Sequence, residues 1–150
     1  MIAWTMDAAD LDLRNATYRL FVTLGRAPSA WETATVTGRS EAGVREGWRR
    51  LHDAHALVLD GGEIRMANPF AAQPTPFRVE AAGRSWFANC GWDAFGIGAA
   101  LHVDSTIYTD CADCHQPLEI HVHGGRPDSE DLVFHVLVPA HAWWNDIGYT

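Results

Sequence analysis

The chain has 150 residues, of which 47% are hydrophobic and 20% are charged, and its formal net charge is −8. This composition excludes a disordered or collagen-like chain, and the negative charge argues against nucleic acid as the main partner. The apolar runs are too short for a membrane-spanning helix and the acidic start lacks the pattern of a secretory signal, so we expect a cytoplasmic protein.

The first half of the chain predicts three helices followed by a hairpin. Apolar residues recur at helical spacing after Arg14, and Ser29 followed by Glu32 has the spacing of a capping box. The predicted elements are helices over 14–25, 28–38 and 41–57, and a hairpin over 56–67 that turns at 60–62. This order resembles a winged helix-turn-helix, so we assign residues 1–67 to a winged-helix-like domain.

The second half predicts a small α+β domain with an antiparallel sheet. Three prolines in residues 68–78 predict a linker, because proline fits neither a helix interior nor a central strand. This second domain then covers residues 79–150. Its predicted elements are strands over 77–81, 101–109, 117–123 and 131–139, a helix over about 85–98 and a short final helix over 140–148.

Cys90 and Asp93 are the first candidate pair for chemistry. At this spacing on a helix, the thiol and the carboxylate would lie side by side. A thiolate is a soft metal ligand and a nucleophile, and a nearby carboxyl group can hold or deliver a proton. Neighbouring aromatic residues should desolvate Asp93 and raise its pKa: Trp86, Phe87, Trp92 and Phe95. The same spacing also fits an inert buried cysteine beside a surface aspartate.

Cys111 and Cys114 form a second candidate pair, between two predicted strands. A C-x-x-C pair is half of a zinc knuckle, and His121 and His123 share one face of the following strand. The chain has no second C-x-x-C pair, so the sequence does not favour zinc there. Haem attachment at C-x-x-C-H belongs to an oxidising compartment and is not expected. The alternative is a tight turn with partly buried thiols.

Three arginines of the third predicted helix could contact phosphate, as in a recognition helix: Arg45, Arg49 and Arg50. Three acidic residues of the same helix offset them, so we expect a solvated helix face rather than a nucleic-acid site.

Three segments of the second half resemble, in order and spacing, the alkylmercury lyase (organomercurial lyase) family: residues 76–101, 109–122 and 132–150. The winged-helix-like segment is similar to the family's N-terminal domain, so the resemblance covers nearly the whole chain. It implies that Cys90 and Asp93 are catalytic, because they match the family's C-x-x-D motif. It also implies that Cys111 matches a cysteine generally regarded as structural.

One departure from the family pattern concerns the second mercury-binding cysteine, which lies downstream of the segment ending at Thr150. No cysteine follows Cys114 in this sequence. We therefore expect a C-terminally short member whose coding sequence continues past an in-frame UGA, and assign mercury to Cys90, Cys111 and Cys114. A histidine ligand, a lost activity, a frameshift and a genuinely short homologue are the alternatives.

The expected reaction is protonolytic cleavage of a carbon–mercury bond, which yields a hydrocarbon and Hg²⁺. Soft thiolates would hold the metal while Asp93 delivers the proton, so no cofactor is expected. The expected partner is a small organomercurial, with neither membrane nor nucleic acid involved. The alternative function is a metal- or thiol-responsive winged-helix regulator, in which the three cysteines sense rather than catalyse.

Overall fold

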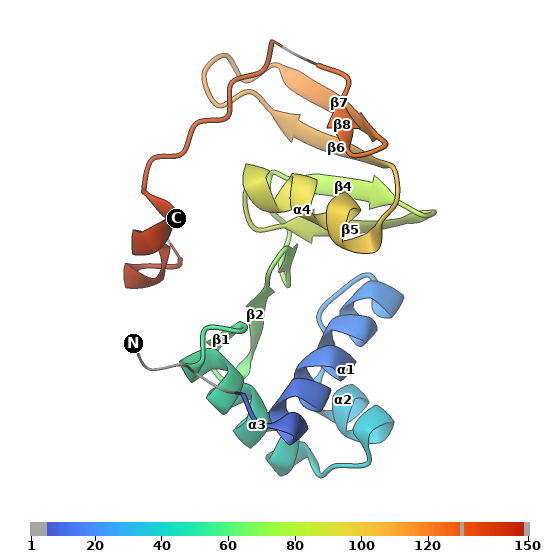
Figure 1. Ribbon diagram of the computed structural model, residues 1–150, viewed down its shortest axis with the longest axis vertical. Helices are drawn as coiled ribbons and strands as arrows, with labels where there is room; N and C mark the ends of the chain where they lie inside the picture. Colours follow the sequence, from blue (N-terminus) through green and yellow to red (C-terminus); the bar gives the residue numbers. More distant parts are fainter. Residues whose placement is uncertain (1–5, 130, 149–150) are drawn as a thin grey trace.

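The computed structural model describes residues 6–129 and 131–148, and its arrangement is shown in Figure 1. Within these residues the helices are α1 (Ala8–Leu24), α2 (Ala30–Thr37), α3 (Glu41–Asp53) and α4 (Gly91–Leu101), and a short 3₁₀ helix, η1 (Ala140–Asn145), comes last. The strands are β1 (Val58–Asp60), β2 (Glu63–Ala67), β3 (Phe70–Ala71), β4 (Arg78–Ala81), β5 (Arg84–Ala88), β6 (Ser105–Asp110), β7 (Pro117–His123) and β8 (Arg126–Pro127). The fold is therefore mixed, with helices and an antiparallel sheet, as expected.

Side-chain caps fix where the first three helices begin. The capping box is confirmed, because Ser29 accepts the backbone N–H of Glu32 while the Glu32 carboxylate accepts that of Ser29. Helix α1 begins earlier than predicted, since Asp7 caps it by accepting the N–H of Asp10. Helix α3 ends at Asp53 rather than at residue 57, because His55 has a left-handed φ of 59°.

The eight strands of the described residues form one antiparallel sheet, in the order β1-β2-β3-β5-β4-β6-β7-β8. The predicted hairpin is confirmed, with its turn at Gly61 and Gly62. Residues 68–78 are only partly a linker, because they contain β3. That strand pairs with β2 on one side and with β5 on the other, so it joins the hairpin to the rest of the sheet.

The predicted helix over residues 85–98 is wrong in its first part. Ala82 and Gly83 both have positive φ, so the chain turns back after β4 and residues 84–88 pair with it as β5. Helix α4 then begins at Gly91 and packs against β4, β5 and β6. The apolar side chains on that face of the sheet form the core, among them Val79, Trp86, Ile107 and Ile120.

The predicted strand over residues 131–139 is also wrong. The outer edge of β7 is occupied at its end, where β8 pairs with Val122 and His123. There the His121 N–H also donates to the Asp128 carboxylate and the Asp128 N–H donates to the His121 carbonyl. Residues 131–139 therefore run free of the sheet with most of their side chains exposed. The chain then returns towards the first helices (Figure 1). There Trp144 stacks on His55 with ring centroids 4.1 Å apart.

No helix among the described residues is both long and apolar enough to span a membrane.

Candidate active site

Cys90 occupies the N-cap position of α4, one residue before the helix begins. Cys90 is therefore the N-cap residue, and Asp93 is the third residue of the first helical turn. The thiol is half-buried, and burial raises its pKa. The backbone N–H groups of Asp93 and Trp92 act in the opposite direction, because they stabilise a thiolate at the positive end of the helix.

Asp93 is half-buried beside this thiol, and burial raises the pKa of its carboxyl group. The expected direction of the shift is confirmed, but two of the four expected aromatic neighbours lie elsewhere. Trp92 is 62% exposed. Trp86 lies in the core, where its indole N–H donates to the carbonyl of Phe21 at 3.2 Å.

Asn89 is a site residue that the sequence did not predict. Its side-chain Nδ2 donates to Asp93 Oδ2 at 3.0 Å and also lies 3.1 Å from Asn68 Oδ1 and 3.3 Å from the carbonyl of Phe70. These contacts tie the carboxylate of α4 to the turn between β2 and β3. No motif marks Asn89, because two of its partners lie about twenty residues away in the chain.

The start of α4 is covered by a segment from the end of the chain. A Cβ atom built on Gly91 would come within 2.7 Å of Phe134 Cε2 and 3.5 Å of Phe77 Cε1. Phe134 also meets Trp92 edge-on, with ring centroids 6.1 Å apart. Aromatic rings thus lie directly on the backbone next to Cys90, and only a glycine leaves room for them.

Cys111 and Cys114 lie together in the tight turn between β6 and β7. Backbone N–H groups of Cys114 and Asp113 and the Cys114 side chain lower the pKa of the Cys111 thiol by hydrogen bonding. Among the described residues, no three His, Cys, Asp or Glu side chains gather as a metal site. The structure therefore does not bring Cys90 to the Cys111–Cys114 pair.

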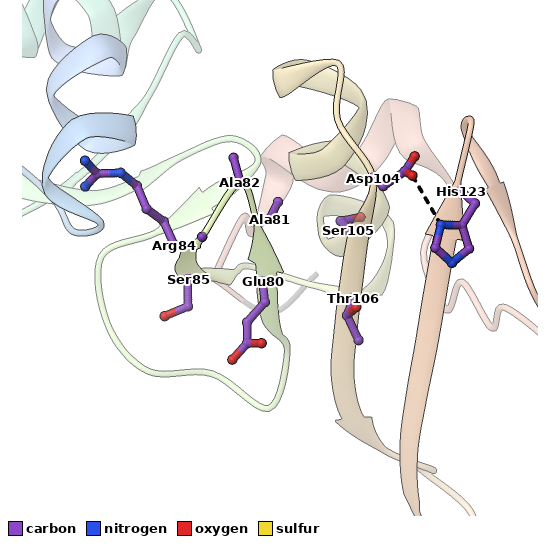
Figure 2. A pocket seen from close by; sticks show the side chains of 10 residues that line it. Glu80, Ala81, Ala82, Arg84, Ser85, Asp104, Ser105, Thr106 and His123 are labelled. Atoms are coloured by element: carbon purple, nitrogen blue, oxygen red, sulfur yellow. Dashed lines mark hydrogen bonds and ion pairs between the residues drawn. The ribbon is translucent and has the colours of Figure 1, made fainter.

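The two histidines of β7 do not join those thiols either. His121 Nδ1 lies 3.2 Å from Thr106 Oγ1, and His123 Nδ1 lies 3.2 Å from Asp104 Oδ2. Figure 2 shows the His123–Asp104 pair in an open hollow of about 670 Å³ next to the β4–β5 turn. Because Asp104 follows the end of α4 and Cys90 precedes its start, this hollow is separate from the Cys90 site.

Two comparisons with known proteins find matches to this chain. The family model described as "MerB: Alkylmercury lyase" matches residues 70–150, which is more than half of the chain and includes Cys90, Asp93 and Cys111. The solved structure titled "Crystal structure of the mercury-bound form of MerB2" is similar in fold, with a TM-score of 0.65 and 22% sequence identity. The similarity covers 85% of this chain and 62% of that chain. No curated protein sequence matches.

Proposed function

Because the chain belongs to the alkylmercury lyase family, we propose that it cleaves carbon–mercury bonds and that Cys90 and Asp93 are its reacting groups. The chain spans about 62% of the length of the mercury-bound relative. The observation that carries it is the pairing of a thiol at a helix N-terminus with a half-buried carboxyl group whose pKa is raised.

The proposed reaction begins when the Cys90 sulfur bonds to the mercury of an organomercurial and displaces the solution thiolate bound to that mercury. The thiol loses its proton in this step, and the Asp93 carboxylate beside it can accept that proton. Burial favours the protonated carboxyl group, which makes Asp93 a proton donor at higher pH than an exposed aspartate.

Asp93 then gives its proton to the carbon bonded to mercury. The electron pair of the carbon–mercury bond forms the new carbon–hydrogen bond, so the hydrocarbon leaves and Hg²⁺ stays on the Cys90 thiolate. No electron is gained or lost overall. We propose that soluble thiols take the second coordination position and remove the Hg²⁺, because Cys111 and Cys114 are not gathered with Cys90.

Headspace gas chromatography tests the proposal by measuring benzene released from phenylmercuric acetate in excess thiol. We expect the wild-type chain to release benzene and Cys90→Ser to release none above the background, because a hydroxyl is a poor mercury ligand. Asp60→Asn changes an exposed carboxylate of the hairpin and serves as the matched control for substitutions of Asp93. Wild-type turnover by Cys90→Ser would contradict the assignment.

For the first part of the chain we propose a winged-helix-like packing domain that does not read DNA. Each of the three arginines that could contact phosphate has a carboxylate partner: Arg45 pairs with Glu63, Arg49 with Glu46 and Arg50 with Asp10. Two of these partners lie outside α3, so the neutralisation does not come from that helix alone. This arrangement weakens attraction to phosphate and disfavours the regulator hypothesis.

We propose that the enzyme works in the cytoplasm. Its three cysteines are free in the structure, and free thiols are typical of a reducing compartment.

A further inference from the structure

The turn between β6 and β7 holds two thiols that the lyase reaction does not use. The backbone N–H of Cys111 donates to the carbonyl of Gln116 at 2.9 Å, which closes the turn where the two strands end. The N–H of His115 donates to the carbonyl of Cys111 at 2.9 Å, and His115 has a left-handed φ of 57°. These bonds bend the chain so tightly that the side chains of Cys111 and Cys114 interact.

The same turn directs hydrogen-bond donors at sulfur. The backbone N–H groups of Asp113 and Cys114 point at the Cys111 sulfur. Cys114 is exposed and Cys111 is half-exposed, so an ion from solution can reach both. The turn therefore holds the two thiols near each other before any metal binds.

We propose that Cys111 and Cys114 form a second soft-metal site, which binds a thiophilic divalent cation such as Hg²⁺ independently of Cys90. Binding forms two S–Hg bonds and releases the two thiol protons, with no change of oxidation state. The proposal rests on the proposed function only for the source of the ion, since the lyase reaction would release Hg²⁺.

The number of ligands decides which metal suits the turn. Structural zinc needs four ligands in a tetrahedral arrangement. The described residues offer no group of three ligands, so the turn supplies only its two sulfurs. Hg²⁺ is satisfied by two thiolates, and the proximity of the two sulfurs gives a high effective concentration for the second bond.

Competition for Hg²⁺ in the Cys90→Ser variant tests the site without any lyase activity. The protein is loaded with one equivalent of Hg²⁺ and titrated with glutathione, and the retained metal is measured by native mass spectrometry. We expect Cys90→Ser to keep Hg²⁺ at a glutathione concentration on the order of a hundredfold higher than Cys90→Ser/Cys114→Ser, because the latter offers only one thiol. Circular dichroism verifies that both variants are folded.

Loss of Hg²⁺ at the same glutathione concentration in both variants would overturn the proposal. Zn²⁺ bound by Cys90→Ser as tightly as Hg²⁺ would also overturn it, since that outcome requires further ligands. Cys90→Ser/Cys111→Ser provides a second single-thiol variant in case the first does not fold. None of these outcomes depends on whether the wild-type chain releases benzene.

Discussion

Asp93 and Asn89 form the contact on which the proposed proton transfer depends. The Asn89 amide donates to the carboxylate at 3.0 Å and lowers the pKa that burial raises. Asn89→Leu removes this donor, so we expect the pKa of Asp93 to rise further. The fall in kcat on the alkaline side should then move to higher pH, as measured by benzene release across a pH series. Asn68→Ala keeps the Asn89–Asp93 bond, and an equal shift in that variant would contradict the assignment.

Asp93→Asn should lower kcat by about a hundredfold or more, because the general acid is lost. Benzene release measures this change.

The stability of the same variant should depend on pH differently from that of the wild type. A raised pKa in the folded state means that ionising Asp93 destabilises the fold, so wild-type stability falls as pH rises between the unfolded and the folded pKa. Asp93→Asn should lack this fall and be at least as stable as the wild type at pH 7. Urea denaturation at several pH values measures the free energy of unfolding of both proteins. Strong destabilisation with unchanged kcat would instead mean that the carboxylate has a structural role.

At the scale of single residues, the sequence predicted what lies within one helical turn. Cys90 and Asp93 were recognised as a pair because their helical spacing places them together, although the helix begins at Gly91 and not near residue 85. Asn89 was missed because its partners Asn68 and Phe70 reach it only through strand pairing. The role of these residues in the reaction stays a prediction.

Helices α1 and α3 are joined by the bond between Asp10 and Arg50. The Asp10 carboxylate is buried and accepts from Arg50 Nε at 2.8 Å and from Nη2 at 2.6 Å. The Arg50 guanidinium therefore lowers the pKa of Asp10. This pair contributes stability above the unfolded-state pKa of Asp10, and that contribution is lost as pH falls through the lower folded-state pKa.

Arg50→Met should therefore destabilise the protein by ~1–3 kcal/mol at pH 7, because it leaves a buried carboxylate without its charged partner. The loss should be smaller in acid, where Asp10 is protonated. Arg49→Met breaks the exposed pair with Glu46 and serves as the control, with an expected cost below ~1 kcal/mol. Urea denaturation at pH 7 and pH 3 measures the free energy of unfolding of both variants. Equal losses in Arg50→Met and Arg49→Met would mean that the Asp10–Arg50 bond does not stabilise the fold.

Secondary structure was predicted well where local signals decide it and poorly where pairing decides it. Capping residues and the Gly61–Gly62 turn located the second helix and the hairpin. The aromatic run before Cys90 fits a helix or a strand equally well, and the turn at Ala82 and Gly83 made it a strand. Residues 131–139 are rich in Val, Leu and Phe as a buried strand would be, yet β8 and Asp128 already pair with the end of β7.

At the scale of the whole molecule, the last segment spans from α4 back to the first helices. Phe134 contacts the backbone at Gly91, and Trp144 stacks on His55. Between these contacts the segment is exposed, with Val133 90% and Leu137 75% accessible. The segment is thus fixed at two places and covers the Cys90 end of α4 at one of them.

Gly91→Ala should displace Phe134, because the new methyl group would lie 2.7 Å from its ring. We expect faster chymotrypsin cleavage within residues 132–137, measured by mass spectrometry of the fragments. Gly96→Ala lies in the same helix but faces Pro69, so it should leave the cleavage rate unchanged. Equal rates in Gly91→Ala and wild type would mean that Phe134 does not hold the segment.

The two-residue strand β3 also determines how the proton donor is aligned. The Phe70 carbonyl of β3 accepts a hydrogen bond from Asn89, so the register of Phe70 against Ala88 determines whether the two residues meet. A slip of one residue in this pairing would turn every side chain of β3 to the other face of the sheet. Inserting a single residue between Ala67 and Phe70 would therefore shift the pKa of Asp93 through Asn89, although neither Cys90 nor Asp93 would have been changed.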